Sequence, residues 1–244
     1  MSIQREIPLL ACLKQKSVLL LGARRTGKSF LLKHQIPAQK RYDLLHADVF
    51  QALSQRPSSI RESLKPSDKI VVIDEIQKLP SLMNEVHAMI EETPVRFVLT
   101  GSSARKLKRT HTALMAGRTR RMTLLPFCYP EISKTFDLNA YLARGGLPPA
   151  HLAPTVDEAW NELRDYAGDY LREEILAEAI VRKIEAFSRF LPIAAGSNGQ
   201  LINFEAIASD AQVPSRTVRE YYSVLEDTLV GYVIQPLRFK GALS

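Results

Sequence analysis

The sequence has little cysteine and no long apolar segment. Cys12 and Cys128 are its only cysteines. Two are too few for a disulfide framework or a zinc site, so we expect two buried thiols and a reducing, cytoplasmic environment. No apolar run approaches the ~20 residues of a membrane-spanning helix. The first ten residues include Glu6 and lack the apolar region of a secretory signal, so we expect no membrane partner.

Acidic residues are absent from one stretch, between Ser102 and Arg121. The basic residues there are Arg105, Lys106, Lys108, Arg109, Arg118, Arg120 and Arg121. The whole chain of 244 residues has a formal net charge of +7. This charge favours a polyanionic partner, such as a nucleotide, a nucleic acid or an acidic membrane surface. The alternative is a basic globular protein with a solvated face and no such partner.

Short apolar runs alternate with amphipathic segments over the first 130 residues. The runs predict strands at residues 17–21, 42–49, 69–76, 95–103 and 119–127, and the segments between them predict helices. Strands that alternate with helices indicate an α/β fold with a parallel sheet and right-handed crossovers.

The stretch "LLLGARRTGKSFLL" (residues 19–32) fits the phosphate-loop pattern G-x-x-x-x-G-K-[ST]. Its glycines let backbone N–H groups surround phosphates, and the following helix adds its positive N-terminus. Lys28 is expected to reach the outer phosphates, and the Ser29 hydroxyl to bind Mg²⁺. The candidate nucleotide-binding residues are Gly22, Arg25, Thr26, Gly27, Lys28, Ser29 and Phe30. The motif leaves open whether the side chains of Arg24 and Arg25 face solvent, a neighbouring subunit or nucleic acid.

Two acids end the strand in "IVVIDE" (residues 70–75). Asp74 is the expected second contributor to the Mg²⁺ site, and Glu75 the expected base for an attacking water. A strand end that meets solvent would also carry acids, but the upstream phosphate loop favours the functional interpretation.

Polar and basic residues follow the next strand. Thr100 and Ser102 in "FVLTGSS" are candidates to contact the γ-phosphate or the water, although helix capping by Ser102 is an equal alternative. Arg118 in "MAGR" is the candidate catalytic arginine, because phosphoryl transfer benefits from a cation on the developing charge. The basic residues at 105–109 are interpreted as a solvated face or a nucleic-acid contact.

The second half of the chain has a different pattern. A Gly/Pro-rich joint at residues 141–152 precedes a helical stretch at 156–191 and a linker at 194–200. Residues 201–239 have the rhythm of a helix-turn-helix followed by a wing at 229–237. Such a module would present Ser215, Arg216 and Arg219 to DNA, or else pack on its own nucleotide domain or on a partner. We therefore predict domains at 1–140, 141–200 and 201–244.

The ordered motifs resemble a known family. The set "LLLGARRTGKSFLL", "IVVIDEIQKLP", "FVLTGSSARKL", "MAGRTRRMTLLPF" and "YLARGGLPPAHL" is similar to prokaryotic AAA-like P-loop ATPases related to archaeal ATPases. The resemblance implies a five-stranded parallel sheet in the order 5-1-4-3-2. It assigns Gly22, Gly27, Lys28 and Ser29 to the phosphate loop, Asp74 and Glu75 to the Walker B position and residues 100–102 to the sensor region. Pro148 in "GGLP" is then either a nucleotide sensor or part of a plain interdomain turn.

The resemblance implies an activity and leaves alternatives. It implies a Mg²⁺-dependent ATPase that couples its nucleotide state to a winged-helix region, with a homo-oligomer or a protein client as partner. The alternatives are a nucleotide-gated regulator of DNA or protein with little turnover, and a degenerate, inactive protein. Family members usually continue into a nuclease-like domain, which this sequence lacks. A truncated gene, a fragment and a shorter relative all stay open.

Overall fold

The computed structural model describes residues 3–102, 117–170 and 184–236. The chain divides into two compact units, Met1–Glu174 and Ile175–Ser244. No helix among the described residues is long and apolar enough to cross a membrane. The predicted domain boundaries at 140 and 200 stay predictions.

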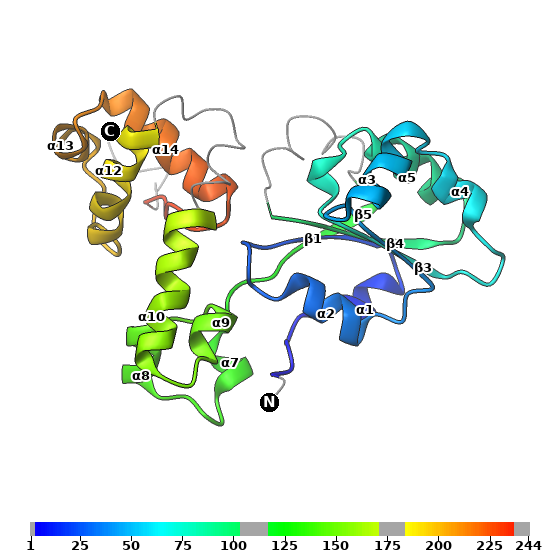
Figure 1. Ribbon diagram of the computed structural model, residues 1–244, viewed down its shortest axis with the longest axis horizontal. Coiled ribbons are helices and arrows are strands. Elements are labelled where there is room, and N and C mark those ends of the chain that lie inside the picture. Colours follow the sequence, from blue (N-terminus) through cyan, green and yellow to red (C-terminus); the bar gives the residue numbers. More distant parts are fainter. Residues whose placement is uncertain (1–2, 103–116, 171–183, 237–244) are drawn as a thin grey trace, which may run out of the picture. The chain divides into compact units, whose positions relative to one another are not determined.

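A parallel sheet of five strands forms the centre of the first unit (Figure 1). The strand order is β2-β3-β4-β1-β5, which is the predicted order 5-1-4-3-2 read from the other edge. The α/β fold and the sheet topology are therefore confirmed. The strands are β1 (Ser17–Leu21), β2 (Lys40–Asp43), β3 (Ile70–Asp74), β4 (Arg96–Gly101) and β5 (Thr119–Thr123).

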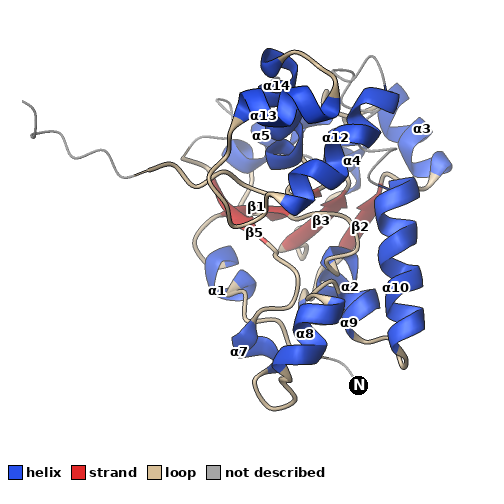
Figure 2. Cartoon of the chain, turned by 90° about the vertical axis from the view of Figure 1, so that its left-hand side faces the viewer, coloured by secondary structure: helices blue, strands red, loops and turns tan. Residues whose placement is uncertain are grey.

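Helices cover both faces of this sheet (Figure 2). One face carries α1 (Leu9–Leu13) and α2 (Lys28–Gln35). The opposite face carries α3 (Ala47–Gln55), α4 (Ser59–Ser63) and α5 (Leu82–Glu92). A short 3₁₀ turn, η1 (Ile76–Lys78), follows β3. The central strands are buried on both faces, which explains their continuous apolar sequences.

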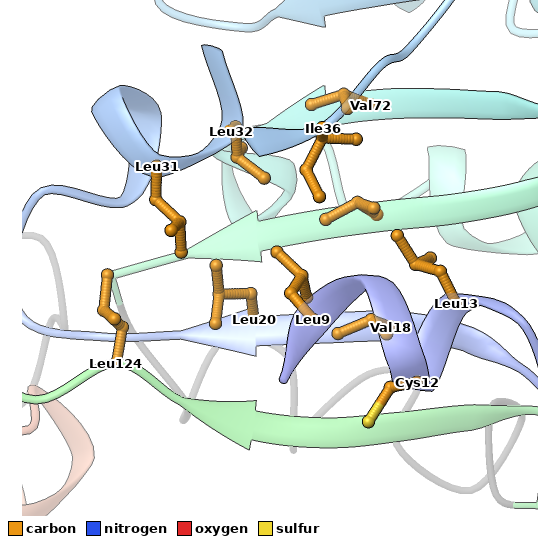
Figure 3. Close-up of a cluster of buried hydrophobic side chains, with 11 residues drawn as sticks. Leu9, Cys12, Leu13, Val18, Leu20, Leu31, Leu32, Ile36, Val72 and Leu124 are labelled. Atoms are coloured by element: carbon orange, nitrogen blue, oxygen red, sulfur yellow. The ribbon is translucent and has the colours of Figure 1, made fainter. Parts of the chain in front are cut away.

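A cluster of apolar side chains joins α1 and α2 to the sheet (Figure 3). Val18 and Leu20 alternate along β1 and therefore point to the same face, where Val98 of the neighbouring strand β4 and Val72 of β3 join them. The helices contribute Leu9, Cys12, Leu13, Leu31 and Leu32, and Ile36 follows directly after α2. This packing holds the start of α2, and with it the phosphate loop, against β1.

Short helices follow the sheet in the first unit. These are α7 (Tyr129–Ile132), α8 (Leu138–Arg144), α9 (Pro148–His151) and α10 (Val156–Asp165), which continues as the π-helical turn η2 (Tyr166–Tyr170). Thr155 and Glu158 form a capping box that starts α10. Pro148 occupies the first position of α9, where its missing N–H costs nothing. Cys12 is buried as expected, but Cys128 is exposed because it lies at the start of α7, outside the core.

The second unit contains the predicted helix-turn-helix. Its helices within residues 184–236 are α12 (Ile184–Gly196), α13 (Phe204–Ala211) and α14 (Ser215–Asp227). Gln212, in the left-handed backbone region, ends α13 and begins the turn. Tyr221 of α14 is buried and packs on Phe187 and Phe190, whereas its neighbour Tyr222 is only half-buried. Residues 229–236, the described part of the predicted wing, contain no strand.

Candidate nucleotide-binding site

The phosphate loop connects β1 to α2 as the motif predicts. A Cβ at Gly22 would lie 2.6 Å from the Leu124 carbonyl oxygen, so only glycine fits there. Gly27 has a φ of 92° and immediately precedes the first residue of α2. Lys28 is buried, and its Nζ donates hydrogen bonds to the carbonyl oxygens of Gly22 (2.8 Å) and Ala23 (3.1 Å). The ammonium group thus lies inside the curve of the loop.

Asp74, at the end of β3, connects the loop to the neighbouring strand. Its carboxylate accepts a hydrogen bond of 2.6 Å from the Ser29 hydroxyl and another from the Thr100 hydroxyl. Asp74 is only 6% exposed, whereas Ser29 is exposed. The parallel arrangement explains this meeting, because β1, β3 and β4 all end at the same edge of the sheet.

Glu75 lies beside this group with its backbone in the left-handed region (φ 58°). Its N–H donates to Thr100 Oγ1 at 3.2 Å. Its carboxylate accepts hydrogen bonds from the Gln77 amide and, at 3.3 Å, from the Ser102 hydroxyl. Gln77 also donates to Ser102 Oγ at 2.9 Å. The three side chains therefore form one buried network that fixes the glutamate.

Two arginines connect the loop to other segments of the first unit. Arg5 Nη1 donates to the Thr26 carbonyl oxygen at 2.6 Å. Arg25 Nη1 lies 2.5 Å from Glu162 Oε2 on α10. Arg25 was predicted as a nucleotide-binding residue with the direction of its side chain left open, and this side chain links the loop to the helical region. Arg25 would contact phosphate either through its backbone N–H or after release of Glu162.

The remaining candidate residues of the predicted site are Phe30 and Arg118. Phe30 is 51% exposed on α2 and its ring stacks on His34. Arg118 immediately precedes β5. Thr119, the first residue of β5, pairs with Ser17, the first residue of β1. Arg118 therefore lies at the amino ends of the strands, at the edge of the sheet opposite the loop, which follows the carboxyl end of β1. β1, which runs from one of these edges to the other, spans roughly 13 Å. The Arg118 side chain instead pairs with Glu91 of α5.

Two groups of residues remain: predicted residues that the structure does not describe, and residues that contact the site without having been predicted. The basic residues at 105–109 lie outside the described residues. Sequence reasoning missed Arg5, Gln77, Glu131 and Glu162. The position of Gln77 two residues after Glu75 was a usable signal, because a short turn keeps such neighbours close. Arg5 has no sequence signal, since its partners come from residues 26 and 125–131.

These features define the class of the protein. A glycine loop between β1 and α2, an acidic pair after β3 and polar side chains after β4 form a P-loop NTPase domain on a parallel sheet. The sequence comparison gives the family: residues 14–133 match the family model described as AAA domain. This part of the chain is therefore an AAA-like P-loop NTPase domain, as its motifs predicted.

The other comparisons concern the second half of the chain, the curated proteins and the solved structures. Residues 135–241 match a domain of unknown function, DUF8612. No curated protein matches the sequence. Among solved structures, the ORC1 protein of Aeropyrum pernix in complex with DNA is similar at 14% identity and a TM-score of 0.41, over 91% of this chain and 81% of that one.

The side chains present suit a magnesium ion bound with a nucleotide. Mg²⁺ prefers hard oxygen ligands and usually keeps several waters when only one or two protein oxygens bind it. The Ser29 hydroxyl and the Asp74 carboxylate supply such oxygens beside the loop. No group of three or more His, Cys, Asp or Glu side chains among the described residues forms a metal site of the all-protein kind. The donor set therefore fits an ion that shares its coordination with phosphate.

Proposed function

We propose that the chain binds Mg-ATP and hydrolyses it. The observation that carries the proposal is the convergence of Lys28, Ser29, Asp74 and Glu75 at one edge of the sheet. Lys28, folded into the loop, neutralises charge on the outer phosphates. Ser29 and Asp74 hold Mg²⁺, which when bound neutralises charge on the phosphate oxygens.

Glu75 supplies the base in this proposal. A water oxygen forms a bond to the γ-phosphorus, and the bond from that phosphorus to the bridging oxygen breaks, so that ADP leaves with the electron pair. Glu75 accepts the proton of the water. Gln77 and Ser102 hold the carboxylate in place, and Thr100 orients both Asp74 and the Glu75 backbone.

Nucleotide state is proposed to reach the helical region through Arg25. The Arg25–Glu162 ion pair connects the phosphate loop to α10, which leads along the chain to the second unit. A phosphate that attracts Arg25 would compete with Glu162 for the same guanidinium. The side chains of Arg25 and Glu162 are 25% and 38% exposed, so we expect a modest effect on stability from this pair.

Steady-state ATP hydrolysis with Mg²⁺ tests the proposal. We expect Glu75→Gln to retain nucleotide binding and lose about 10²–10⁴-fold in turnover, the usual contribution of a general base. Lys28→Ala should lose tight binding. Matched controls are Glu62→Gln, at an exposed position of α4, and Lys33→Ala, at an exposed position of α2. Retained ATP binding without turnover at any protein concentration would contradict hydrolysis and leave the nucleotide-gated regulator.

DNA binding by the second unit is a second candidate function. The observation in its favour is the α13-turn-α14 geometry with an exposed Arg216, whose side chain is 91% accessible. Two facts weigh against it. Arg219 lies over the Phe204 ring, with 3.9 Å from Cζ to the ring centroid. Residues 175–244 contain equal numbers of basic and acidic residues, so this unit adds nothing to the net charge of +7.

The salt dependence of binding to duplex DNA separates these possibilities. If α14 contacts phosphates, Arg216→Ala should weaken binding and reduce the slope of log K against log salt by about one. Arg56→Ala, an exposed arginine of the first unit, is the control. Identical slopes for Arg216→Ala and the wild type would exclude the DNA contact by this residue.

A further inference from the structure

Arg5 is a buried cation that joins three separate segments of the first unit. It precedes α1 and is 8% exposed. Its Nε donates to Glu131 Oε1 at 2.8 Å, and both side chains of this ion pair are nearly inaccessible. Its Nη2 donates to the Leu125 carbonyl oxygen. Its Cζ lies 5.0 Å from the centre of the Phe127 ring.

The third hydrogen bond of Arg5 reaches the phosphate loop itself. Nη1 donates to the carbonyl oxygen of Thr26 at 2.6 Å, and this contact is buried. That carbonyl belongs to the peptide unit between Thr26 and Gly27. In a planar trans peptide the C=O and the following N–H point in opposite directions. Fixing the Thr26 carbonyl on Arg5 therefore turns the Gly27 N–H toward the other side of the loop.

The orientation of this N–H matters because a phosphate loop works through backbone amides that point inward. The Thr26 hydroxyl restrains the same turn by donating to the Ala23 carbonyl oxygen at 2.8 Å. Gly27, with its positive φ, has many backbone conformations available in the absence of such restraints. Arg5 is the side chain that holds this flexible peptide from outside.

Glu131 in turn fixes Arg5. One oxygen, Oε1, also accepts the Glu6 N–H at 3.0 Å, and the other, Oε2, accepts the Cys128 N–H at 3.1 Å. The carboxylate is therefore held by α7 and the N-terminal segment together. A planar guanidinium can satisfy a carboxylate and two carbonyl oxygens at once, whereas a lysine ammonium lacks this fork geometry.

We propose that Arg5 is a positioning residue for nucleotide phosphates. It holds the Thr26 carbonyl so that the Gly27 amide faces the bound phosphates, and Glu131 holds Arg5 in that role. The proposal rests on the proposed nucleotide binding and assigns part of the affinity for phosphates to a residue outside the motif. A purely structural Arg5 would instead anchor the N-terminal segment and affect stability alone.

Nucleotide affinities of full-length variants separate a positioning role from a structural one. Dissociation constants for Mg-ADP and AMP are measured for the wild type, Arg5→Lys and Glu131→Gln, beside thermal unfolding. We expect Arg5→Lys to weaken Mg-ADP binding about tenfold, as expected for the loss of one charge-assisted hydrogen bond. Glu131→Gln should act in the same direction and more weakly. AMP affinity should change little, because its single phosphate depends less on the loop amides.

The control and the contradicting outcomes are distinct. Arg61→Lys is the matched control, because Arg61 also binds two partners, Glu85 and Glu92, but lies on α4. Equal losses for Mg-ADP and AMP, or unchanged affinities beside a lowered melting temperature, would overturn the positioning role. If Arg5→Lys does not fold, Glu131→Gln decides by the same criterion. A wild type that binds no nucleotide would refute the proposed function together with this inference, whereas a tight-binding wild type with unaffected variants refutes this inference alone.

Discussion

Glu75 is one of four non-glycine residues with a positive φ in the part of the chain that the structure describes. Its φ of 58° and ψ of 42° lie in the left-handed region. This region costs an ordinary L-residue roughly 1–2 kcal/mol and costs glycine nothing. A strained conformation at a catalytic candidate indicates that the geometry of the site outweighs local preference.

The strain predicts a difference between two substitutions at this position. Glu75→Gly and Glu75→Ala both remove the carboxylate and its contacts with Gln77 and Ser102. The glycine variant should nevertheless be more stable by about 1 kcal/mol, because only alanine retains the backbone strain. Urea denaturation of the two variants measures the difference. Equal stabilities would show that the left-handed conformation carries no cost here.

Glu131 is expected to make the stability of the first unit depend on pH. Burial raises the pKa of its carboxyl, but hydrogen bonds from the Arg5 guanidinium and from the Glu6 and Cys128 amides outweigh that effect and hold the pKa below its ordinary value of 4.5. A carboxyl with a lowered pKa stabilises the folded state at pH values above the ordinary one, and loses this contribution as the pH falls through the lowered one.

The expected consequence is a loss of stability in acid that depends on Glu131. Between neutral pH and about pH 5, the stability difference between wild type and Glu131→Gln should be constant. Below pH 4.5 it should shrink as the wild-type carboxyl takes up its proton. Thermal unfolding as a function of pH measures it. A difference that stays constant down to pH 3 would contradict the assignment.

At the scale of elements, α2 depends on the cluster that it shares with α1 and the sheet. Leu31 is 1% exposed, and it lies two residues after Ser29. Leu31→Ala should therefore destabilise the first unit by about 2–5 kcal/mol, as truncations of buried leucines do. Leu10→Ala on α1, where the side chain is 45% exposed, is the matched control and should cost far less. Chemical denaturation followed by circular dichroism compares the two, and similar losses would argue against the packing described.

At the scale of the whole molecule, the distance between Arg118 and the phosphate loop bears on assembly. Arg118 lies at the sheet edge opposite the loop of its own chain. Its proposed catalytic role therefore requires the site of a neighbouring subunit. Specific activity should then rise with protein concentration.

Mixing two inactive variants tests this arrangement. Arg118→Ala retains an intact phosphate site, and Glu75→Gln retains the arginine. A mixture should recover part of the ATPase activity that neither variant shows, because one supplies the site and the other the arginine. In the control mixture, Arg56→Ala takes the place of Arg118→Ala. The Arg56→Ala variant should already be active by itself. An Arg118→Ala variant with wild-type activity at every concentration would exclude the role.

Much of the fold and the motif residues could be predicted because their physical causes are local. The runs at residues 17–21, 70–74 and 96–101 are apolar enough to require burial on both faces, and β1, β3 and β4 form there. Predicted bounds were less accurate where burial is partial. The second strand was expected at 42–49, but β2 ends at Asp43 and α3 begins at Ala47.

The sequence by itself determined the α/β class, the phosphate loop and the acidic pair, because each depends on residues adjacent in the chain. Only the tertiary structure decided which distant groups act on them. Arg5 meets Thr26 and Glu131 across separations of 21 and 126 residues. Arg25 meets Glu162 of α10, and Arg118, the candidate catalytic arginine, lies at the end of the sheet opposite the loop of its own chain. Strand order and helix packing set these distances, and no local pattern encodes them.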